Sequence, residues 1–270
     1  MPTSLVCPVC HAPLSVKERS LVCPLRHSFD MAKSGYVNLL LKKAGQHGDN
    51  DMMLAARQSF LSRGYYAHLA EALKEAVSSL PLPTSPTVLD CGTGEGYYLE
   101  AVKEALKEKA PSLYGFDISK QALLFAAKRK LGAALFVASA YSVPMASESV
   151  DLEMLFFSPF CREESLRVLK KNGYLVMAIP AEAHLWELKQ LIYDTPYRNE
   201  LAAFEIEGFS LLSHQHVEKA LFLPSQEEIQ LLFQMTPYYY KTSPRDKEKT
   251  KVPQSLSVTA AFELLVYQKQ

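Results

Sequence analysis

Residues 88–98 read VLDCGTGEGYY, in which Gly92, Gly94 and Gly96 follow a short apolar run and precede a helical run. Glycine is needed where a backbone turns tightly and a ligand approaches closely, because a Cβ atom would block that approach. Dinucleotide-binding folds use a related pattern, so three glycines alone are a weak signal. They still predict a strand, a turn and a helix that together form a ligand site.

Two details of this segment favour a particular ligand. The glycine spacing is G-x-G-x-G rather than G-x-G-x-x-G, and Asp90 sits at the strand end just before Gly92. An acid at that point would repel a pyrophosphate and attract a ligand that carries an ammonium group. S-adenosylmethionine carries both an ammonium and a sulfonium, so this segment predicts an S-adenosylmethionine site.

A second acid, Asp117, ends the next predicted strand, 25 residues beyond Gly92. A carboxylate at that position can accept hydrogen bonds from both hydroxyls of a ribose. The nucleoside half of the same ligand therefore has a predicted partner.

Strands and helices alternate on both sides of these motifs. The predicted strands are 87–89, 112–116, 134–137, 150–157 and 174–179; the predicted helices are 52–61, 67–80, 99–109, 120–130 and 162–169. Such alternation predicts an α/β fold with a parallel, doubly wound sheet and ligands at the carboxyl ends of its strands. A turn is expected at 170–173, and the alternating segment 256–268 is predicted to be an edge strand.

The amino-terminal segment carries a different signal: Cys7-x2-Cys10, then twelve residues, then Cys23-x3-His27. This spacing can place three thiolates and an imidazole around a structural Zn²⁺. A segment of some 40 residues is too small to fold on apolar burial alone, which favours a metal. The alternatives are a redox Cys-x-x-Cys pair or a disulfide framework, and His11 competes with His27 as the fourth ligand.

The remaining cysteines, Cys91 and Cys161, lie in apolar segments and are interpreted as core or near-core residues without a chemical role. A linker-like stretch, 42–51, follows the metal-binding segment. The sequence therefore predicts a zinc-binding module at 1–41 and a larger domain at 52–270.

The overall composition limits the function classes. The chain has 270 residues, 48% of them hydrophobic, with 29 basic and 29 acidic residues. Zero net charge argues against nucleic-acid binding by bulk electrostatics alone, although residues 1–50 hold six basic and three acidic residues. No long uncharged apolar stretch and no signal peptide are seen, so we expect a cytoplasmic protein with no membrane partner.

Several segments together resemble a known family. VLDCGTGEGYY, YGFDIS and ESLRVLKKNGYLV are similar to motifs of class I S-adenosylmethionine-dependent methyltransferases. With CPVCHAPL, CPLRHSFDMAKSGYVNLL, ARQSFLSRGYY, HLWELKQLIY and LLFQMTPYYYK, the chain resembles the bacterial 23S ribosomal RNA guanine-N1 methyltransferases. These matches run from about residue 7 to 241. The resemblance implies a Rossmann-like class I methyltransferase sheet with a small amino-terminal zinc-binding domain.

The resemblance also implies roles for individual residues. In that family zinc is held by residues that correspond to Cys7, Cys10, Cys23 and His27. The resemblance also implies four cofactor contacts beyond those argued from the strand ends and glycines: Tyr66, Tyr98, Leu99 and His184. The full predicted cofactor-binding set is Tyr66, Asp90, Gly92, Gly94, Tyr98, Leu99, Asp117 and His184.

The implied reaction is methyl transfer from S-adenosylmethionine to N1 of a guanine in a hairpin of 23S ribosomal RNA. The basic residues Lys17, Arg19, Arg26 and Lys33 of the zinc module would then grip the RNA, or form an ordinary solvated surface. A small-molecule methyltransferase of the quinone type and an inactive nucleic-acid-binding protein are the alternatives. Both a monomer and a homodimer stay open.

One segment departs from the pattern of related enzymes. Residues 157–160, Phe-Ser-Pro-Phe, are faintly like the [DNS]-P-P-[FYW] loop with which some nitrogen methyltransferases hold a base. They contain one proline and no carboxylate. The catalytic general base is therefore not identified from the sequence.

Overall fold

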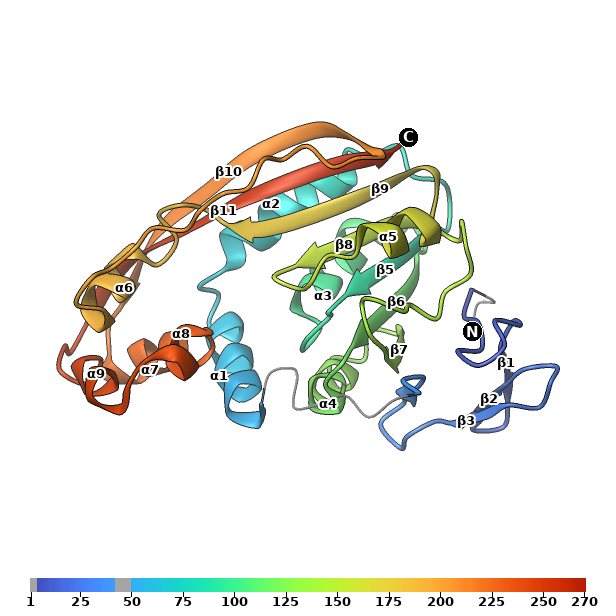
Figure 1. Ribbon diagram of the computed structural model, residues 1–270, viewed down its shortest axis with the longest axis horizontal. Coiled ribbons are helices and arrows are strands. Elements are labelled where there is room, and N and C mark those ends of the chain that lie inside the picture. The colour runs from blue at the N-terminus through green and yellow to red at the C-terminus, as the bar shows by residue number, and fades with distance from the viewer. Residues whose placement is uncertain (1–3, 42–49) are drawn as a thin grey trace.

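The computed structural model describes residues 4–41 and 50–270, so residues 42–49 of the predicted linker lie outside the described residues. The main sheet has eight strands, and a separate three-stranded sheet lies near the amino terminus (Figure 1). The strands are β1 (Ser15–Lys17), β2 (Ser20–Val22), β3 (Ser28–Asp30), β4 (Val37–Asn38), β5 (Thr87–Cys91), β6 (Ser112–Asp117), β7 (Ala134–Val137), β8 (Val150–Phe156), β9 (Leu169–Pro180), β10 (Phe209–Leu223) and β11 (Leu256–Lys269).

The helices pack around the main sheet. They are α1 (Asp51–Ser62), α2 (Ala67–Ser78), α3 (Tyr97–Ala105), α4 (Lys120–Lys128), α5 (Arg162–Val168), α6 (Trp186–Ile192), α7 (Gln226–Gln234), α8 (Tyr238–Lys241) and α9 (Pro244–Lys249), with a 3₁₀ turn at Lys107–Lys109. No helix in the described ranges has the length and apolar character needed to cross a membrane.

The order of the main sheet is β10-β11-β9-β8-β5-β6-β7-β4. Strands β4 to β9 within it run parallel, while β10 and β11 form a long antiparallel ribbon. Parallel strands connected by helices are the predicted doubly wound architecture, which is confirmed.

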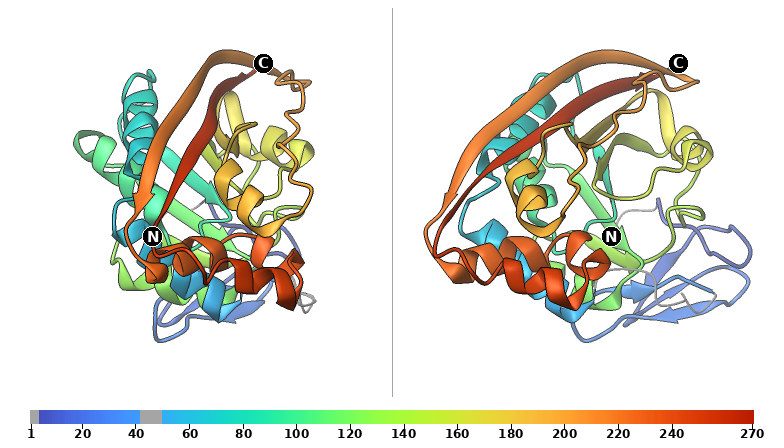
Figure 2. Two further views of the ribbon diagram at one scale, coloured as in Figure 1. Left: turned by 90° about the vertical axis from the view of Figure 1, so that its left-hand side faces the viewer. Right: turned by 60° about the vertical axis from the view of Figure 1, so that its left-hand side comes forward.

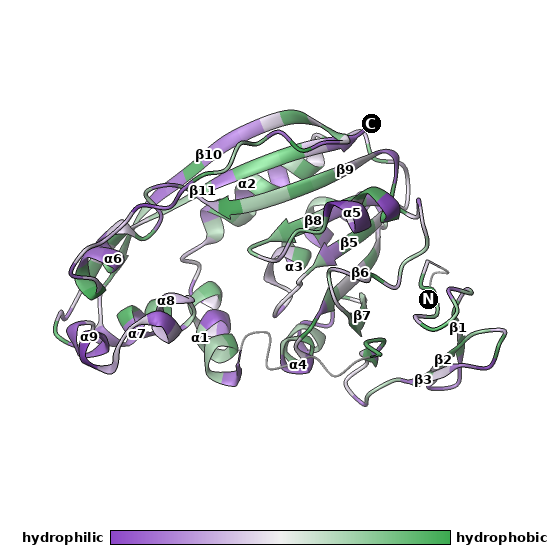
Figure 3. Cartoon of the chain, in the orientation of Figure 1, coloured by the Kyte–Doolittle hydropathy of each residue, from purple (hydrophilic) through white to green (hydrophobic). Residues whose placement is uncertain are grey.

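Neighbouring residues of the central strands serve two cores on opposite faces of the sheet. Val88 and Met154 pack with the α2 and α3 face, whereas Leu89 and Leu155 pack with the opposite face, which α5 covers. This is the period-two alternation of a strand buried on both sides. Figure 3 shows the result: β8 and β9 are coloured mostly hydrophobic, and α5 and α9 mostly hydrophilic.

The amino-terminal segment is packed against the main sheet rather than held apart from it. β4 pairs in parallel with β7, and Leu5 forms an isolated bridge with Met145. Leu14 and Leu21 belong to the same apolar cluster as Phe136 of β7. The views in Figures 1 and 2 place this segment beside the β7 edge, at the end remote from the β10–β11 ribbon.

One prediction about the carboxy-terminal segment is wrong. Residues 256–268 do form a strand, β11, but it lies between β10 and β9, and β10 is the edge. Most side chains of β10 are exposed, including Leu212, which is 51% exposed. An edge strand with one solvated face lacks the apolar run that marks a buried strand, which explains why β10 was missed.

The predicted turn at 170–173 needs a smaller correction. β9 begins at Leu169, so these residues extend the strand instead of preceding it. Asn172 nevertheless has φ of 62°, the left-handed conformation that asparagine tolerates better than most residues.

Candidate functional site

The glycine turn lies at the carboxyl end of β5, between β6 and β8. Gly92 has φ of 73°, and a Cβ atom there would approach Cβ of Ser158 to 2.4 Å. The Ser158 hydroxyl donates to the Cys91 carbonyl at 2.6 Å, and the Gly92 N–H donates to the Phe116 carbonyl at 2.9 Å. Only glycine meets both the conformational and the steric demand at position 92.

Asp90 lies beneath this turn and is 2% exposed. Burial, opposed by the hydrogen bond from Thr93 and reinforced by the negative charge of Asp117, raises the pKa of Asp90 to about 7. The Thr93 hydroxyl donates to Oδ2 of Asp90 at 2.6 Å. A buried carboxyl group of this kind is suited to a cationic ligand, because a cation would restore the ionised form.

Asp117 ends β6 and is fixed by two backbone donors. The Gly94 N–H donates to its Oδ2 at 3.0 Å, and the Ser119 N–H donates to its Oδ1 at 2.8 Å. Ser119 also caps α4 through its hydroxyl. The carboxylate therefore couples the glycine turn to the start of α4, at the carboxyl edge where sheets of this class bind ligands.

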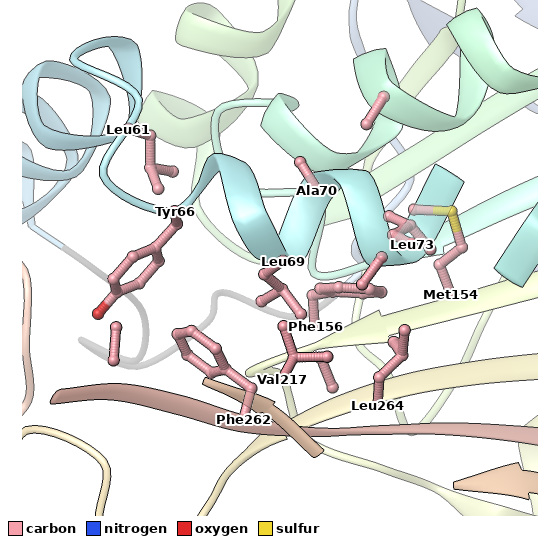
Figure 4. Close-up of a cluster of buried hydrophobic side chains, with 14 of the residues drawn as sticks. Leu61, Tyr66, Leu69, Ala70, Leu73, Met154, Phe156, Val217, Phe262 and Leu264 are labelled. Carbon is pink, nitrogen blue, oxygen red and sulfur yellow. The ribbon is translucent and has the colours of Figure 1, made fainter. Parts of the chain in front are cut away.

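Aromatic rings extend from the glycine turn to the predicted residues Tyr66 and His184. The members of this aromatic wall are Tyr66, Tyr98, Phe156, Phe157, His184 and Phe262. Ring centroids are 4.4 Å apart for Tyr98 and Phe156, 5.5 Å for Phe157 and Phe262, and 4.9 Å for Tyr66 and Phe262. In Figure 4 the Tyr66 hydroxyl points away from Leu69 and Leu73.

Within this wall, His184 and Tyr98 have distinct polar environments. Burial lowers the pKa of His184 to about 3. Nδ1 of the ring accepts a hydrogen bond from the Ala261 N–H at 3.3 Å. His184 is therefore neutral at physiological pH. The Tyr98 hydroxyl is buried, and among the described residues it has no hydrogen-bond partner. Because buried hydroxyls are seldom left unpaired, a ligand at this site would supply the missing partner.

Leu99 differs from the other predicted site residues. Its side chain is fully buried in the core between the sheet and α2. It helps to fix the first turn of α3.

The four predicted metal ligands form one cluster. The ligand atoms of Cys7, Cys10, Cys23 and His27 all lie within 4.8 Å of one another. Nδ1 of His27 is 3.5 Å from Sγ of Cys7 and 3.4 Å from Sγ of Cys23. Three sulfurs and one nitrogen at this separation fit a closed tetrahedral zinc site. His11 is exposed and is not part of the cluster.

Comparisons with known proteins agree with both the metal cluster and the site at the glycine turn. A zinc-ribbon family described as "RlmA, N-terminal" matches residues 5–43, and a family described as "Methyltransferase domain" matches residues 84–235. A protein of Micromonospora griseorubida named "Putative 23S rRNA (guanine-N(1)-)-methyltransferase" is 31% identical, over 97% of this chain and 96% of its own. The chain belongs to the 23S rRNA (guanine-N1)-methyltransferase family. It is an S-adenosylmethionine-dependent methyltransferase with a zinc-ribbon domain.

Further relatives extend the comparison. The 23S rRNA (guanine(748)-N(1))-methyltransferase of Streptomyces fradiae is 34% identical over 68% of this chain and 66% of its own. A solved Haloferax volcanii complex between the Trm112 methyltransferase activator and a methyltransferase matches with a TM-score of 0.52 at 18% identity, covering 83% of this chain and 99% of the other. The structural match shows a shared fold.

Sequence reasoning missed some charged residues around the methyltransferase site. Glu95, which is 2% exposed, forms an ion pair with Arg129, whose Nε also donates to the Glu95 carbonyl at 2.8 Å. Arg57 of α1 also lies near the turn, with Nη1 3.9 Å from the ideal Cβ position of Gly94. Both arginines lie in segments predicted as helices, but no sequence signal distinguishes them from surface arginines, since their partners are distant in the chain.

Proposed function

We propose that this methyltransferase modifies N1 of a guanine in a hairpin of 23S ribosomal RNA, in the cytoplasm where ribosomes are made. The observation that carries the proposal is the presence, in one chain, of a Cys₃His cluster packed on the same sheet that carries the Asp90 and Asp117 turn. A small-molecule enzyme has no evident use for the zinc ribbon. Two relatives that align over 97% of this chain are named as putative 23S rRNA guanine-N1 methyltransferases.

The cofactor-binding residues follow from the described geometry. Asp90 would receive the ammonium group of S-adenosylmethionine, Asp117 the ribose hydroxyls, and the Tyr98 hydroxyl a polar atom of the same ligand. Gly92 and Gly94 leave space for close approach, and Tyr66 and His184 close the far end. S-adenosylmethionine supplies the electrophilic methyl group when bound. Cys7, Cys10, Cys23 and His27 would hold the zinc ion, which has a structural role.

Replacing Asp117 by alanine should weaken S-adenosylmethionine binding by about 1.5–3 kcal/mol, the usual range for a hydrogen bond to a charged group. The loss arises because both ribose hydroxyls lose their acceptor. Isothermal titration calorimetry would measure it, with circular dichroism confirming that the sheet is intact. Unchanged affinity would mean that the ribose is held elsewhere.

Cofactor affinity should also depend on pH through Asp90. Its pKa is raised to about 7 in the free protein, so the carboxylate that attracts the ammonium is progressively lost as the pH falls from 8 to 6. Affinity should decline toward a slope of about tenfold per pH unit below 7. Asp90→Asn is the matched control: it should bind weakly and lack this part of the pH dependence. Equal pH profiles for the two proteins would contradict the assignment.

Guanine N1 carries a proton at neutral pH, so that proton must leave as the new N–C bond forms. A base within a hairpin must also be splayed out of its stack before it reaches the methyl group. We propose that the splayed base stacks on Phe157. This residue is 46% exposed, lies at the carboxyl end of β8, and its ring contacts those of Tyr98 and Phe262. Its backbone has φ of 59°, a conformation that bulky residues rarely adopt.

The zinc module supplies a surface for the rest of the RNA. Lys17, Arg19, Arg26 and Lys33 are all exposed in the structure. Phosphate contacts from such residues fix the position of an RNA without reading its sequence. We therefore propose that the module positions the hairpin so that one guanine reaches Phe157.

A direct assay tests the substrate class. Purified protein would be incubated with radiolabelled S-adenosylmethionine and either 23S ribosomal RNA or a short-chain quinone precursor. The proposal predicts label in the RNA alone. Label in the small molecule alone would favour the quinone-type alternative.

A further inference from the structure

The methionine end of S-adenosylmethionine carries a carboxylate as well as an ammonium group. Asp90 and Asp117 lie beside the glycine turn, and the charge of Glu95 within the turn is compensated by Arg129. A carboxylate brought into that environment would be repelled unless a cation lay close to it. A cation at the turn other than Arg129, which pairs with Glu95, would remove this repulsion.

Arg57 of α1 has this position. Its Nη1 lies 3.9 Å from the point where a Cβ atom on Gly94 would stand. Its Nη2 donates to the carbonyl of Met235, at the end of α7, at 3.4 Å. One edge of the guanidinium is thus fixed by α7, and another nitrogen of the same group faces the glycine turn.

The charge of Arg57 also acts on the groups that line the site. Burial raises the pKa values of Tyr66, Tyr98 and Glu95, and in each case the positive charge of Arg57 opposes that increase. These groups belong to the aromatic wall and to the turn itself. Arg57 therefore lies close to the same space that the methionine end of the cofactor would occupy.

We propose that Arg57 binds the carboxylate of S-adenosylmethionine, an inference that rests on the cofactor site proposed above. Guanidinium groups are well matched to carboxylates because they donate parallel hydrogen bonds in a fixed plane. In the amino-acid end of the cofactor, Asp90 then binds the ammonium group and Arg57 binds the carboxylate. Since Arg57 belongs to α1, cofactor binding also connects α1 and α7 to the glycine turn.

The test compares two ligands that differ only in the carboxylate: S-adenosylmethionine and decarboxylated S-adenosylmethionine. Their affinities for wild type, Arg57→Met and Arg57→Lys would be measured by calorimetry. Arg57→Met should bind S-adenosylmethionine about 10- to 100-fold more weakly. The same variant should bind the decarboxylated ligand within about twofold of wild type, because this ligand has no carboxylate for Arg57 to bind. The affinity of Arg57→Lys for S-adenosylmethionine should lie between those of wild type and Arg57→Met.

Arg63→Met is the matched control, because Arg63 immediately follows α1 and pairs with Glu228. It should leave both affinities unchanged. An equal loss for both ligands in Arg57→Met would overturn the proposal and assign Arg57 a structural role. Unchanged binding of S-adenosylmethionine would overturn it as well. RNA methylation does not enter this test, so its result is separate from the fate of the proposed RNA substrate.

Discussion

Replacing Cys23 by serine should remove the bound zinc and unfold the amino-terminal module, with a large loss of overall stability. Structural zinc contributes about 10–16 kcal/mol of binding free energy in small modules, and that energy is folding energy. Cys7 and Cys23 are also buried in the cluster that contains Phe136 of β7. The damage should therefore spread to the β4–β7 edge of the main sheet. Metal analysis and thermal unfolding would measure both effects.

Cys161→Ser is the control for this prediction, because Cys161 lies outside the metal cluster. It should retain about one zinc per chain and an unfolding temperature near that of wild type. A Cys23→Ser protein with wild-type stability would show that zinc is not needed to fold the module. Native protein that contains no zinc when prepared without chelators would refute the metal assignment itself.

Replacing Phe157 by alanine should lower kcat/KM for RNA methylation by about 10²- to 10³-fold. Stacking of a base on an aromatic ring contributes roughly 1–3 kcal/mol, and a misplaced base loses further rate, on the order of 10²-fold, through poor alignment with the methyl group. Cofactor affinity should change much less. Steady-state kinetics with an RNA hairpin, together with calorimetry for the cofactor, would separate the two effects.

Phe222→Ala offers a matched comparison, since Phe222 is 61% exposed but lies on β10. Its kinetics should match those of wild type. If Phe157→Ala methylates RNA at the wild-type rate, the target guanine does not stack on this ring. If it loses cofactor affinity to the same extent as activity, the ring serves the cofactor instead.

The sequence predicted the parts of this molecule that depend on local patterns. The glycine turn required Gly92 for backbone reasons, and Asp90 and Asp117 followed from their places at strand ends. The metal cluster followed from cysteine spacing, because four ligands on two tight turns have few other arrangements. In each case the signal lies within a few residues of the chain.

Features that depend on distant contacts were not predicted. In the sequence Phe157 is only part of a degenerate loop, and no local pattern predicts its left-handed backbone, with φ of 59°. The approach of Arg57 to Gly94 depends on how α1 packs against α7. From the sequence, residues 1–41 are predicted to form a module separate from the larger domain. In the structure β4 of this module pairs with β7 of the main sheet. Deleting the module would therefore disturb the main sheet, and point substitutions are the better test of its role.

Exposed basic residues of the module offer such a test without disturbing the core. Arg19→Glu and Arg26→Glu should weaken RNA binding and flatten its dependence on salt, because each lost phosphate contact reduces the number of counterions released. Filter-binding titrations at several salt concentrations would show this. Unchanged salt dependence would shift RNA recognition to residues 238–251, which hold five basic and two acidic residues.

The identity of the methylated atom is the most direct test of the central proposal. Unmodified 23S ribosomal RNA would be treated with the protein and S-adenosylmethionine, digested to nucleosides for mass spectrometry, and mapped in parallel by primer extension. We expect 1-methylguanosine and a reverse-transcription stop at one hairpin guanine, because a methyl group on N1 blocks Watson–Crick pairing. A different methylated nucleoside, or RNA that acquires no methyl group while the protein binds S-adenosylmethionine normally, would contradict the account.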